Sequence, residues 1–449
     1  MDIKNFDQDL LDLRDFSKRL EKFIDTEIVF VDGSLVVALS SKFGSGKTTF
    51  LKMWKSSLEE TTAGKPFVVS LNAWESDYYG DPLFAIISGM VESIQNKGES
   101  AERLINAAKD FGWFATAISS QVVRKITGID PVEAGAYAES KKSERENGRN
   151  PAEDAFSLYR NRKQAMDFLR GSISEFISSS EPKVWFLIDE LDRCRPDYAI
   201  NYLETIKHIF NIKGAVFILA ADRQQLENSA RSEFGADLDF DEYYRKFIHR
   251  EIALPKITDL GYRNLTLEYV KFYLEKEDSR FCFMRVDDER LGDIRRLIKA
   301  LKLTPRQIQE VFRILGHVLS TSENNRGRLL WCLAVGSIVM AALKIGDPRI
   351  FQLLGNQEFE PKDAIQYIRK TLGDANAYWW FKFFLTGGGL QIQENEPAEA
   401  TIKRAGIEDV STAEFGPENL MQWKQEWGHS DRNRFREIHE KIEQIYQWN

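Results

Sequence analysis

Short, largely apolar runs alternate with segments of helical periodicity over the first 257 residues of the chain. Uninterrupted apolar runs are typical of strands that are buried on both faces of a parallel sheet. Four runs have the length of a strand: residues 35–39, 66–71, 184–188 and 215–220. Because buried strands that alternate with helices build layered α/β domains, the pattern predicts an α/β fold with a central parallel sheet flanked by helices.

From about residue 258 to the end of the chain, apolar residues recur at helical spacing alone. Leu301, Ile308, Phe312 and Leu315 follow the intervals that place apolar side chains on one face of a helix. No convincing strand alternation is present in this part of the sequence. We therefore expect a mainly α-helical C-terminal region.

Two apolar segments of this region have more than one interpretation. Residues 329–343 form a stretch of 15 uncharged residues, shorter than the roughly 18 to 20 residues that span a bilayer. We interpret this stretch as a buried core helix, with a membrane helix as the alternative. We also interpret the aromatic cluster at residues 378–384 as part of a buried helix. The alternatives are a partner-binding patch and a platform on which bases stack.

Residues 91–165 interrupt the alternating pattern of the first part of the chain. This stretch is poor in strand-like runs and rich in charged residues, a composition that opposes burial. We expect it to be a helical, charged insertion into the sheet domain.

Charge and cysteine content narrow the range of partners and compartments. The chain carries 61 Lys and Arg residues against 69 Asp and Glu, a net charge of −8, so any nucleic-acid contact would require a local basic groove. Cys194, Cys282 and Cys332 are too dispersed for a disulfide framework or a Cys-based zinc site. The first 23 residues are charged throughout and lack the apolar core of a signal peptide. We therefore expect a cytoplasmic protein in which Cys194 is a structural thiol.

A glycine-rich loop follows the first predicted strand. Residues 41–48, SKFGSGKT, match the phosphate-binding pattern G-x-x-x-x-G-K-[ST] except at Ser41, where the pattern has glycine. Glycines permit the tight turn that brings backbone N–H groups to a phosphate at the start of a helix. Lys47 would neutralise the β- and γ-phosphates and Thr48 would coordinate Mg²⁺, whereas the alternative is an ordinary glycine-containing turn. The candidate nucleotide-binding residues are Phe43, Gly44, Ser45, Gly46, Lys47, Thr48 and Thr49.

Acidic residues follow the third and fourth predicted strands. Asp189 would complete the magnesium shell with Thr48, since ligands bind at the carboxyl ends of strands in open α/β sheets. Glu190 is placed to orient or activate the attacking water, or else to favour a helix N-terminus through the helix dipole. The position of Asp222 is equally consistent with a sensor of the γ-phosphate and with a cap of the next helix.

Taken in order along the chain, these segments resemble the KAP P-loop NTPases of the additional-strand ATPase class. The resemblance covers residues 9–319 and rests on SKFGSGKTT, LNAWESDYYGDPLFAIISGM, FLIDELDRC, VFILAADRQQLENSA, YYRKFIHREIALP and TPRQIQEVFRIL. It implies a P-loop NTPase core over residues 1–257 and a helical lid over residues 258–325. A helical domain to which no motif gives a role follows at residues 326–449.

The resemblance and the motifs together define the expected chemistry. The implied cofactors are ATP and Mg²⁺. The candidate catalytic residues are Lys47, Asp189, Glu190, Asp222 and Arg306, with Arg306 as a cation that stabilises the charge of the transition state. We expect a nucleoside-triphosphate hydrolase, and ATP is the preferred nucleotide because the chain has no Asn-Lys-x-Asp motif of guanine-binding proteins.

The chain departs from the family pattern at three motif positions. Ser41 replaces a glycine, Glu190 stands in a typically Asp-Asp pair, and Thr304 replaces an asparagine. Glutamate strengthens the case for hydrolysis, because it is the usual water-orienting residue of this ATPase class. Many family members also carry two transmembrane helices before the acidic strand, where residues 101–165 of this chain are interrupted by charges. We therefore expect no membrane insertion.

The resemblance implies an ATPase that switches or assembles a complex, in a bacterial anti-phage setting with a separate effector protein. We expect a homo-oligomer or a complex with that effector. The main alternative is a nucleotide-gated scaffold with negligible turnover, which would not need a water-orienting Glu190. A nucleic-acid motor is a third alternative, but the sequence lacks an evident basic tract.

Overall fold

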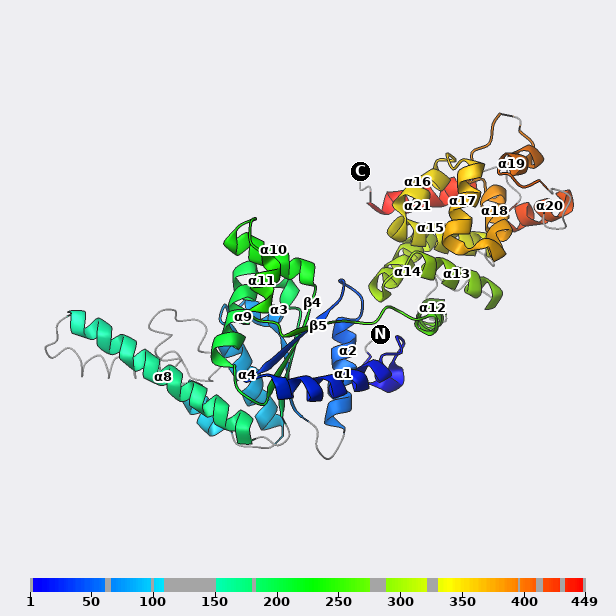
Figure 1. The fold of residues 1–449 in the computed structure, drawn as a ribbon. Coiled ribbons are helices and arrows are strands. Elements are labelled where there is room, and N and C mark those ends of the chain that lie inside the picture. The colour runs from blue at the N-terminus through cyan, green and yellow to red at the C-terminus, as the bar shows by residue number, and fades with distance from the viewer. Residues whose placement is uncertain are drawn as a thin grey trace. The chain divides into compact units, whose positions relative to one another are not determined.

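The computed structural model describes ten segments of the chain, which form two compact units. The segments are residues 3–60, 66–97, 101–108, 151–179, 183–274, 288–320, 330–394, 396–408, 415–428 and 433–446. The first unit comprises Met1–Asp9 and Leu13–Lys256, and the second comprises Leu10–Asp12 and Ile257–Asn449. Figure 1 shows the sheet of the first unit in blue to green and the helices of the second in green to red.

The first unit is built on a parallel sheet of five strands. The strands are β1 (Leu35–Ser40), β2 (Phe67–Asn72), β3 (Val184–Asp189), β4 (Ala215–Ala221) and β5 (Arg250–Ala253). They lie in the order β2-β3-β4-β1-β5, and all pairs are parallel. The α/β fold class predicted from the sequence is confirmed, and β4 is inserted between β1 and β3.

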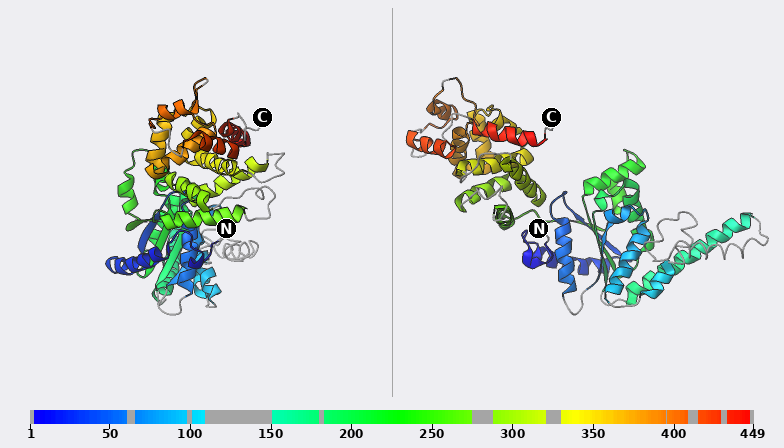
Figure 2. Two further views of the ribbon diagram at one scale, coloured as in Figure 1. Left: turned by 90° about the vertical axis from the view of Figure 1, so that its right-hand side faces the viewer. Right: turned by 180° about the vertical axis from the view of Figure 1, so that it is seen from behind.

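Helices cover both faces of this sheet, as Figures 1 and 2 show. On one face α2 (Lys47–Glu59) packs against the central strands, with Trp54 against Trp185 of β3 at a ring distance of 5.5 Å. On the other face, alternate residues of the strands form a core with α4 (Pro82–Asn96), α9 (Pro196–Ile209) and α10 (Arg223–Phe234). Burial on both faces explains the uninterrupted apolar runs in the sequence.

The described part of the first unit also contains shorter or peripheral helices. They include α1 (Arg14–Glu27), α3 (Ala73–Asp77), α8 (Pro151–Ser179) and α11 (Phe240–Arg245), and residues 102–108 are helical as well. The carboxyl-terminal part of α8 packs into the core through Leu169, Ile173 and Ile177. Residues 109–150, the greater part of the predicted insertion, lie outside the described residues.

The second unit is mainly helical, as predicted. Its helices are α12 (Asp259–Leu274), α13 (Asp288–Ala300), α14 (Pro305–Ser320), α15 (Trp331–Gly346), α16 (Pro348–Gly355), α17 (Pro361–Leu372), α18 (Ala377–Thr386), α19 (Ala398–Arg404), α20 (Pro417–Glu426) and α21 (Arg434–Tyr446). The described part of this unit holds one isolated β-bridge, between Phe359 and Leu390.

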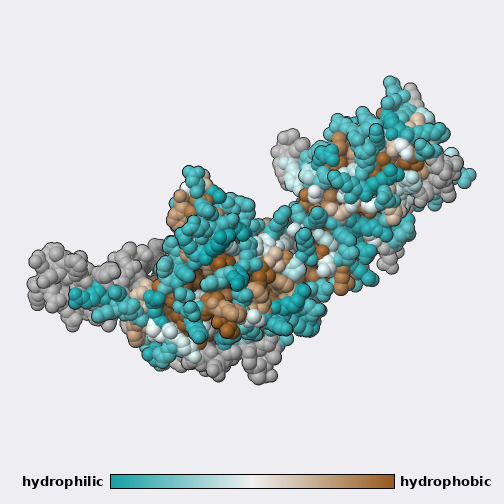
Figure 3. Space-filling view, in the orientation of Figure 1, coloured by the Kyte–Doolittle hydropathy of each residue, from teal (hydrophilic) through white to brown (hydrophobic). Residues whose placement is uncertain are grey.

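Residues 331–343 of the uncharged stretch form most of α15, the central helix of this unit, and residue 329 lies outside the described residues. Helix α15 is buried along almost its whole length and is contacted by α13, α14, α16, α20 and α21. Trp380, Phe381, Phe383 and Phe384 of α18 are likewise buried, so the core interpretation of the aromatic cluster is confirmed for these four residues. Figure 3 shows mostly hydrophilic residues on the visible face of this unit. Within the described segments, every helix is too short or too polar to cross a bilayer.

Candidate functional site

The loop between β1 and α2 has the backbone of a phosphate-binding loop. Gly44 and Gly46 have φ angles of 76° and 103°, in the left-handed region that only glycine adopts without strain. The carbonyl of Gly46 accepts a hydrogen bond from the Phe50 N–H at 2.8 Å, so α2 begins directly at the loop. The candidate nucleotide-binding residues 43–49 therefore lie in this loop and in the first turn of a helix, where backbone N–H groups attract anions.

Polar groups in the loop fit a phosphate ligand. The Ser45 hydroxyl is buried and has no hydrogen-bond partner among the described residues. Gly46, which precedes the first turn of α2, offers no side chain to cap the N–H groups of that turn. Buried donors without a protein acceptor are costly unless a ligand satisfies them. The residues present thus fit a nucleotide phosphate at this position.

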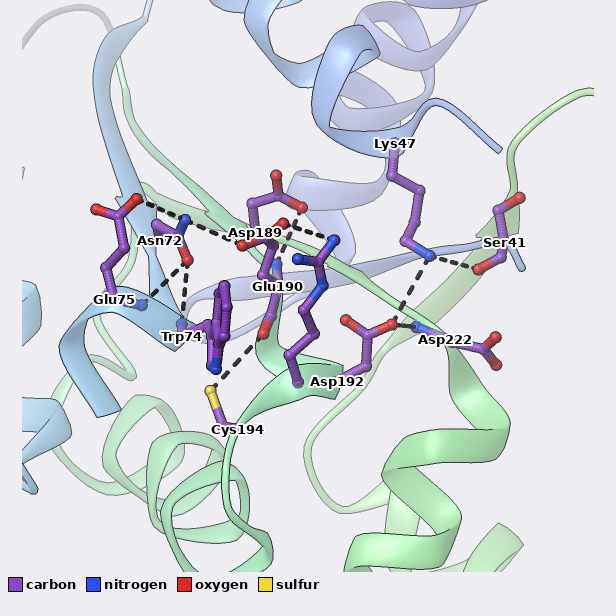
Figure 4. A network of polar contacts seen from close by, with 11 residues as sticks. Ser41, Lys47, Asn72, Trp74, Glu75, Asp189, Glu190, Asp192, Cys194 and Asp222 are labelled. Carbon is purple, nitrogen blue, oxygen red and sulfur yellow. Dashed lines mark hydrogen bonds and ion pairs between the residues drawn. The ribbon is translucent and has the colours of Figure 1, made fainter. Parts of the chain in front are cut away.

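Lys47 is held in the site by groups from two other segments. Its ammonium donates a hydrogen bond to the Ser41 carbonyl at 2.5 Å and lies 3.8 Å from Asp192 Oδ2. The side chains of Lys47 and Asp192 are only 9% and 5% exposed, so the pair is shielded from solvent. Asp192 Oδ2 also accepts a hydrogen bond from the Asp222 N–H at 2.8 Å. Asp192 therefore links the P-loop lysine to the end of β4 (Figure 4).

Asp189 and Thr48 form the candidate magnesium pair. The Thr48 side chain lies next to the Asp189 carboxylate and favours its charged form. Burial raises the pKa of Asp189, an effect that Thr48 opposes and the neighbouring Glu190 and Asp192 reinforce. The described residues contain no group of three or more His, Cys, Asp and Glu side chains that could hold a metal. Mg²⁺ commonly takes one or two protein oxygens plus substrate phosphates, so a hydroxyl and a carboxylate suffice.

Glu190 follows Asp189 in a strained backbone conformation. Its φ of 60° lies in the left-handed region, which is rare outside glycine and often marks functional positions. Its N–H donates a hydrogen bond to Asp189 Oδ1 at 2.9 Å. The carboxylate has a different partner on each oxygen: Arg193 Nη2 lies 2.8 Å from Oε1, and Asn72 Nδ2 donates to Oε2 at 3.1 Å. The contact between Asn72 and Glu190 can be followed in Figure 4.

Asn72 is a site residue that the sequence analysis missed. It is the last residue of β2 and pairs with Asp189 in the register of the sheet. Its side-chain oxygen caps α3 by accepting the N–H groups of Trp74 and Glu75 at 3.1 and 3.3 Å, which directs its amide nitrogen toward Glu190. In the sequence, Asn72 is a polar residue that directly follows a predicted strand, within the segment LNAWESDYYGDPLFAIISGM that carries part of the family resemblance.

The corner that carries Asn72 is fixed to the start of α9. Asp77 accepts hydrogen bonds from the Arg195 N–H and from Arg195 Nε, both at 2.9 Å. The Tyr198 hydroxyl donates to Ser76 Oγ at 3.0 Å. These contacts join α3 to the start of α9, so Asn72 and Glu190 are positioned by one connected structure.

Two further candidate catalytic residues, Asp222 and Arg306, lie in different parts of the structure. Asp222 caps α10, because its Oδ1 accepts the Gln224 N–H at 3.0 Å, and its own N–H joins the network of Asp192. The capping alternative is therefore what the structure contains, and the sensor role stays a prediction. Arg306 belongs to the second unit, in the first turn of α14, so its catalytic role also stays a prediction.

Two other residues from the sequence analysis have structural roles. Thr304 and Gln307 form a reciprocal capping box at the start of α14, with bonds of 2.9 and 3.3 Å. Threonine can thus replace the family's asparagine as a helix cap. Cys194 is buried, and burial next to Asp77 and Asp192 raises its thiol pKa to about 12. A thiol that stays protonated is a poor nucleophile.

Comparison with known proteins identifies the family of this chain. The family model described as the KAP family P-loop domain matches residues 14–321, more than half of the sequence. A search of curated proteins gives no match. Among solved structures, the chain is similar to the ORC2 protein of Aeropyrum pernix in its ADPNP-ADP complexes, with 11% identity and a TM-score of 0.34 over 97% of this chain and 94% of that one. By the family match and by the P-loop geometry described above, the protein belongs to the KAP family of P-loop NTPases.

Proposed function

We propose that this protein binds ATP with Mg²⁺ at the P-loop and hydrolyses it. The observation that carries the proposal is the convergence of two side-chain pairs at the carboxyl edge of the sheet. Thr48 and Asp189 supply hard oxygen ligands for a cation, and Glu190 is held beside them by Asn72. A protein that only binds nucleotide needs the first pair but has no use for the second.

Different residues of the chain bind the phosphates, hold Mg²⁺ and activate the attacking water. The N–H groups of the loop and the Lys47 ammonium bind the phosphates, and Lys47 exchanges its contact with Asp192 for them. Thr48 and Asp189 would hold Mg²⁺, which when bound offsets the negative charge that builds up on the phosphate oxygens. Glu190 orients the attacking water and accepts its proton through a carboxylate oxygen.

The proposal also includes a catalytic arginine in the second unit and a role for turnover in the cell. Arg306 supplies a positive charge to the transition state from the helical lid predicted at residues 258–325. Turnover switches or assembles a complex, either of several copies of this chain or with a separate effector protein. The bacterial anti-phage setting is proposed from the family resemblance alone.

Calorimetric titration of the full chain tests nucleotide binding and its specificity. We expect ATP to bind more tightly with Mg²⁺ than without it, and more tightly than GTP. Lys47→Ala is the control, because it removes the phosphate-binding cation. Binding of ATP by the wild type without any phosphate release would replace the hydrolase by the nucleotide-gated scaffold, whereas equal binding by Lys47→Ala would contradict both.

A further inference from the structure

Arg193 lies between two half-exposed aromatic rings and the Glu190 carboxylate. Its guanidinium carbon is 4.8 Å from the ring centre of Phe43 and 5.5 Å from that of Trp74, distances at which a cation is attracted to the face of an aromatic ring. Its Nη2 is 2.8 Å from Glu190 Oε1. One side chain thus connects the P-loop, the corner after β2 and the candidate catalytic carboxylate.

The pair of Arg193 and Glu190 is partly shielded from water. The two side chains are 32% and 13% exposed, and a guanidinium–carboxylate contact in such surroundings is stronger than a fully exposed ion pair. It holds one carboxylate oxygen of Glu190 while Asn72 holds the other. In this arrangement both oxygens of the water-orienting group already have a protein partner.

The two partners of Glu190 differ in one contact. Asn72 belongs to the corner that Asp77 and Arg195 fix to the start of α9. Arg193 packs on Trp74 of the same corner but also on Phe43, a residue of the P-loop itself. A rearrangement of the loop around a phosphate therefore changes one of the two ring contacts of Arg193 and leaves the contacts that hold Asn72 in place.

We propose that Arg193 is a positioning residue that restrains Glu190 until the P-loop binds a phosphate. Movement of Phe43 with the loop releases Arg193 from Glu190 Oε1, while Oε2 stays with Asn72. The freed oxygen can then accept a hydrogen bond from water. This inference rests on the proposed function, because the released carboxylate acts in hydrolysis, and it couples occupancy of the loop to the activation of Glu190.

Steady-state kinetics of the full chain provide the first test. Arg193→Ala should raise kcat/KM for ATP by about three- to tenfold, the range of one partly exposed ion pair, through a lower KM, and should leave kcat nearly unchanged, because at saturating ATP the restraint is already released. Arg193→Lys keeps the charge without the planar stacking group, so an intermediate kcat/KM is expected. An unchanged or lower kcat/KM in Arg193→Ala would overturn the restraint.

Arg296→Ala is the matched control for these variants. Arg296 forms the same type of pair, three positions along a helix, with Asp293 at 2.6 Å. Its side chain is 44% exposed and that of Asp293 is 7% exposed, and both lie in α13 of the second unit. Loss of this pair should leave kcat and kcat/KM unchanged, and an increase in kcat/KM equal to that of Arg193→Ala would overturn the specific role of Arg193.

The emission of Trp74 provides a test that does not depend on turnover. It is measured as the difference between each protein and its Trp74→Phe variant, with ADP and a non-hydrolysable ATP analogue in the presence of Mg²⁺. We expect a nucleotide-dependent change in the wild type and none in Arg193→Ala or Lys47→Ala. If calorimetry detects binding by the wild type but the Trp74 emission does not respond, the coupling is wrong while the proposed hydrolysis stands. A response without phosphate release would support the coupling and contradict hydrolysis.

Discussion

The side-chain amide of Asn72 donates a hydrogen bond to Glu190 Oε2 at 3.1 Å, across 118 positions of sequence. The contact forms because β2 and β3 are neighbours whose register pairs Asn72 with Asp189. Asn72 at the same time caps α3 through its side-chain oxygen. One side chain therefore fixes a helix start and orients the candidate catalytic carboxylate.

Asn72→Asp separates these two roles. Aspartate caps a helix as well as asparagine does, so the stability should stay close to that of the wild type. The second carboxylate would repel Glu190 instead of donating to it, and we expect kcat to fall roughly tenfold, or about 1.4 kcal/mol of transition-state stabilisation. Urea unfolding and phosphate release measure the two effects. A wild-type kcat in Asn72→Asp would show that Asn72 only caps α3.

His249 gives the first unit a pH-dependent contribution to stability. Its Nδ1 accepts the Val36 N–H at 3.0 Å, and burial, Lys207 and Arg250 lower its pKa. The unfolded chain therefore binds a proton more readily than the folded one below about pH 6.5. This contribution is present above that pH and is lost as the pH falls through the folded pKa. Thermal unfolding should show that His249→Asn weakens the decline in Tm below pH 6.5. An identical decline in both proteins would contradict the prediction.

Cys194 should resist alkylation in the folded protein. With its pKa raised to about 12, its thiolate fraction at pH 8 is about one in ten thousand, so reaction should be roughly a thousandfold slower than in the unfolded chain. The rate assigned to Cys194 is the difference between the wild type and Cys194→Ser, with and without urea. Equal rates in both conditions would show that this thiol is accessible and not structural.

Two helical glycines of the second unit test its packing in opposite directions. A Cβ at Gly336 of α15 would lie 2.6 Å from the buried Trp427 ring, whereas one at Gly292 of α13 would meet nothing within 4 Å. Gly336→Ala should lower the free energy of unfolding by about 1–3 kcal/mol. Gly292→Ala should raise it by about 0.5–1 kcal/mol, because alanine favours the helix. Urea unfolding measures both, and equal effects would contradict the packing of α15 against Trp427.

The sequence alone predicts β1, β3 and β4 because these strands are buried on both faces. The hydrophobic pattern does not predict β5, whose four residues Arg250–Ala253 are mostly exposed and carry charge, and only the resemblance of YYRKFIHREIALP to the family's strand-to-lid segment implies a strand there. This segment becomes a strand by pairing with Val37–Ser40 of β1, a contact between segments far apart in the chain. The local pattern of hydrophobic residues cannot predict a pairing between such distant segments.

Some residues of the candidate site can likewise be predicted from the sequence, whereas the contacts of others cannot. Lys47 and Thr48 can be predicted because one loop and one helix start place them, and Asp189 because it ends a strand. Asn72 and Asp192 depend on the order and register of strands, so their contacts with Glu190 and Lys47 cannot be inferred from spacing.

The most direct test of hydrolysis at this site compares phosphate release from ATP by the wild type and by Glu190→Gln, with ATP affinity measured on the same samples. Glutamine keeps the shape of the side chain and an acceptor for Asn72, but it cannot take a proton from water. The account predicts Mg²⁺-dependent turnover in the wild type and, in Glu190→Gln, a loss of at least about a hundredfold with ATP binding intact. Equal turnover in the two proteins would contradict the catalytic role of Glu190, and the absence of phosphate release from the wild type would contradict the hydrolase account.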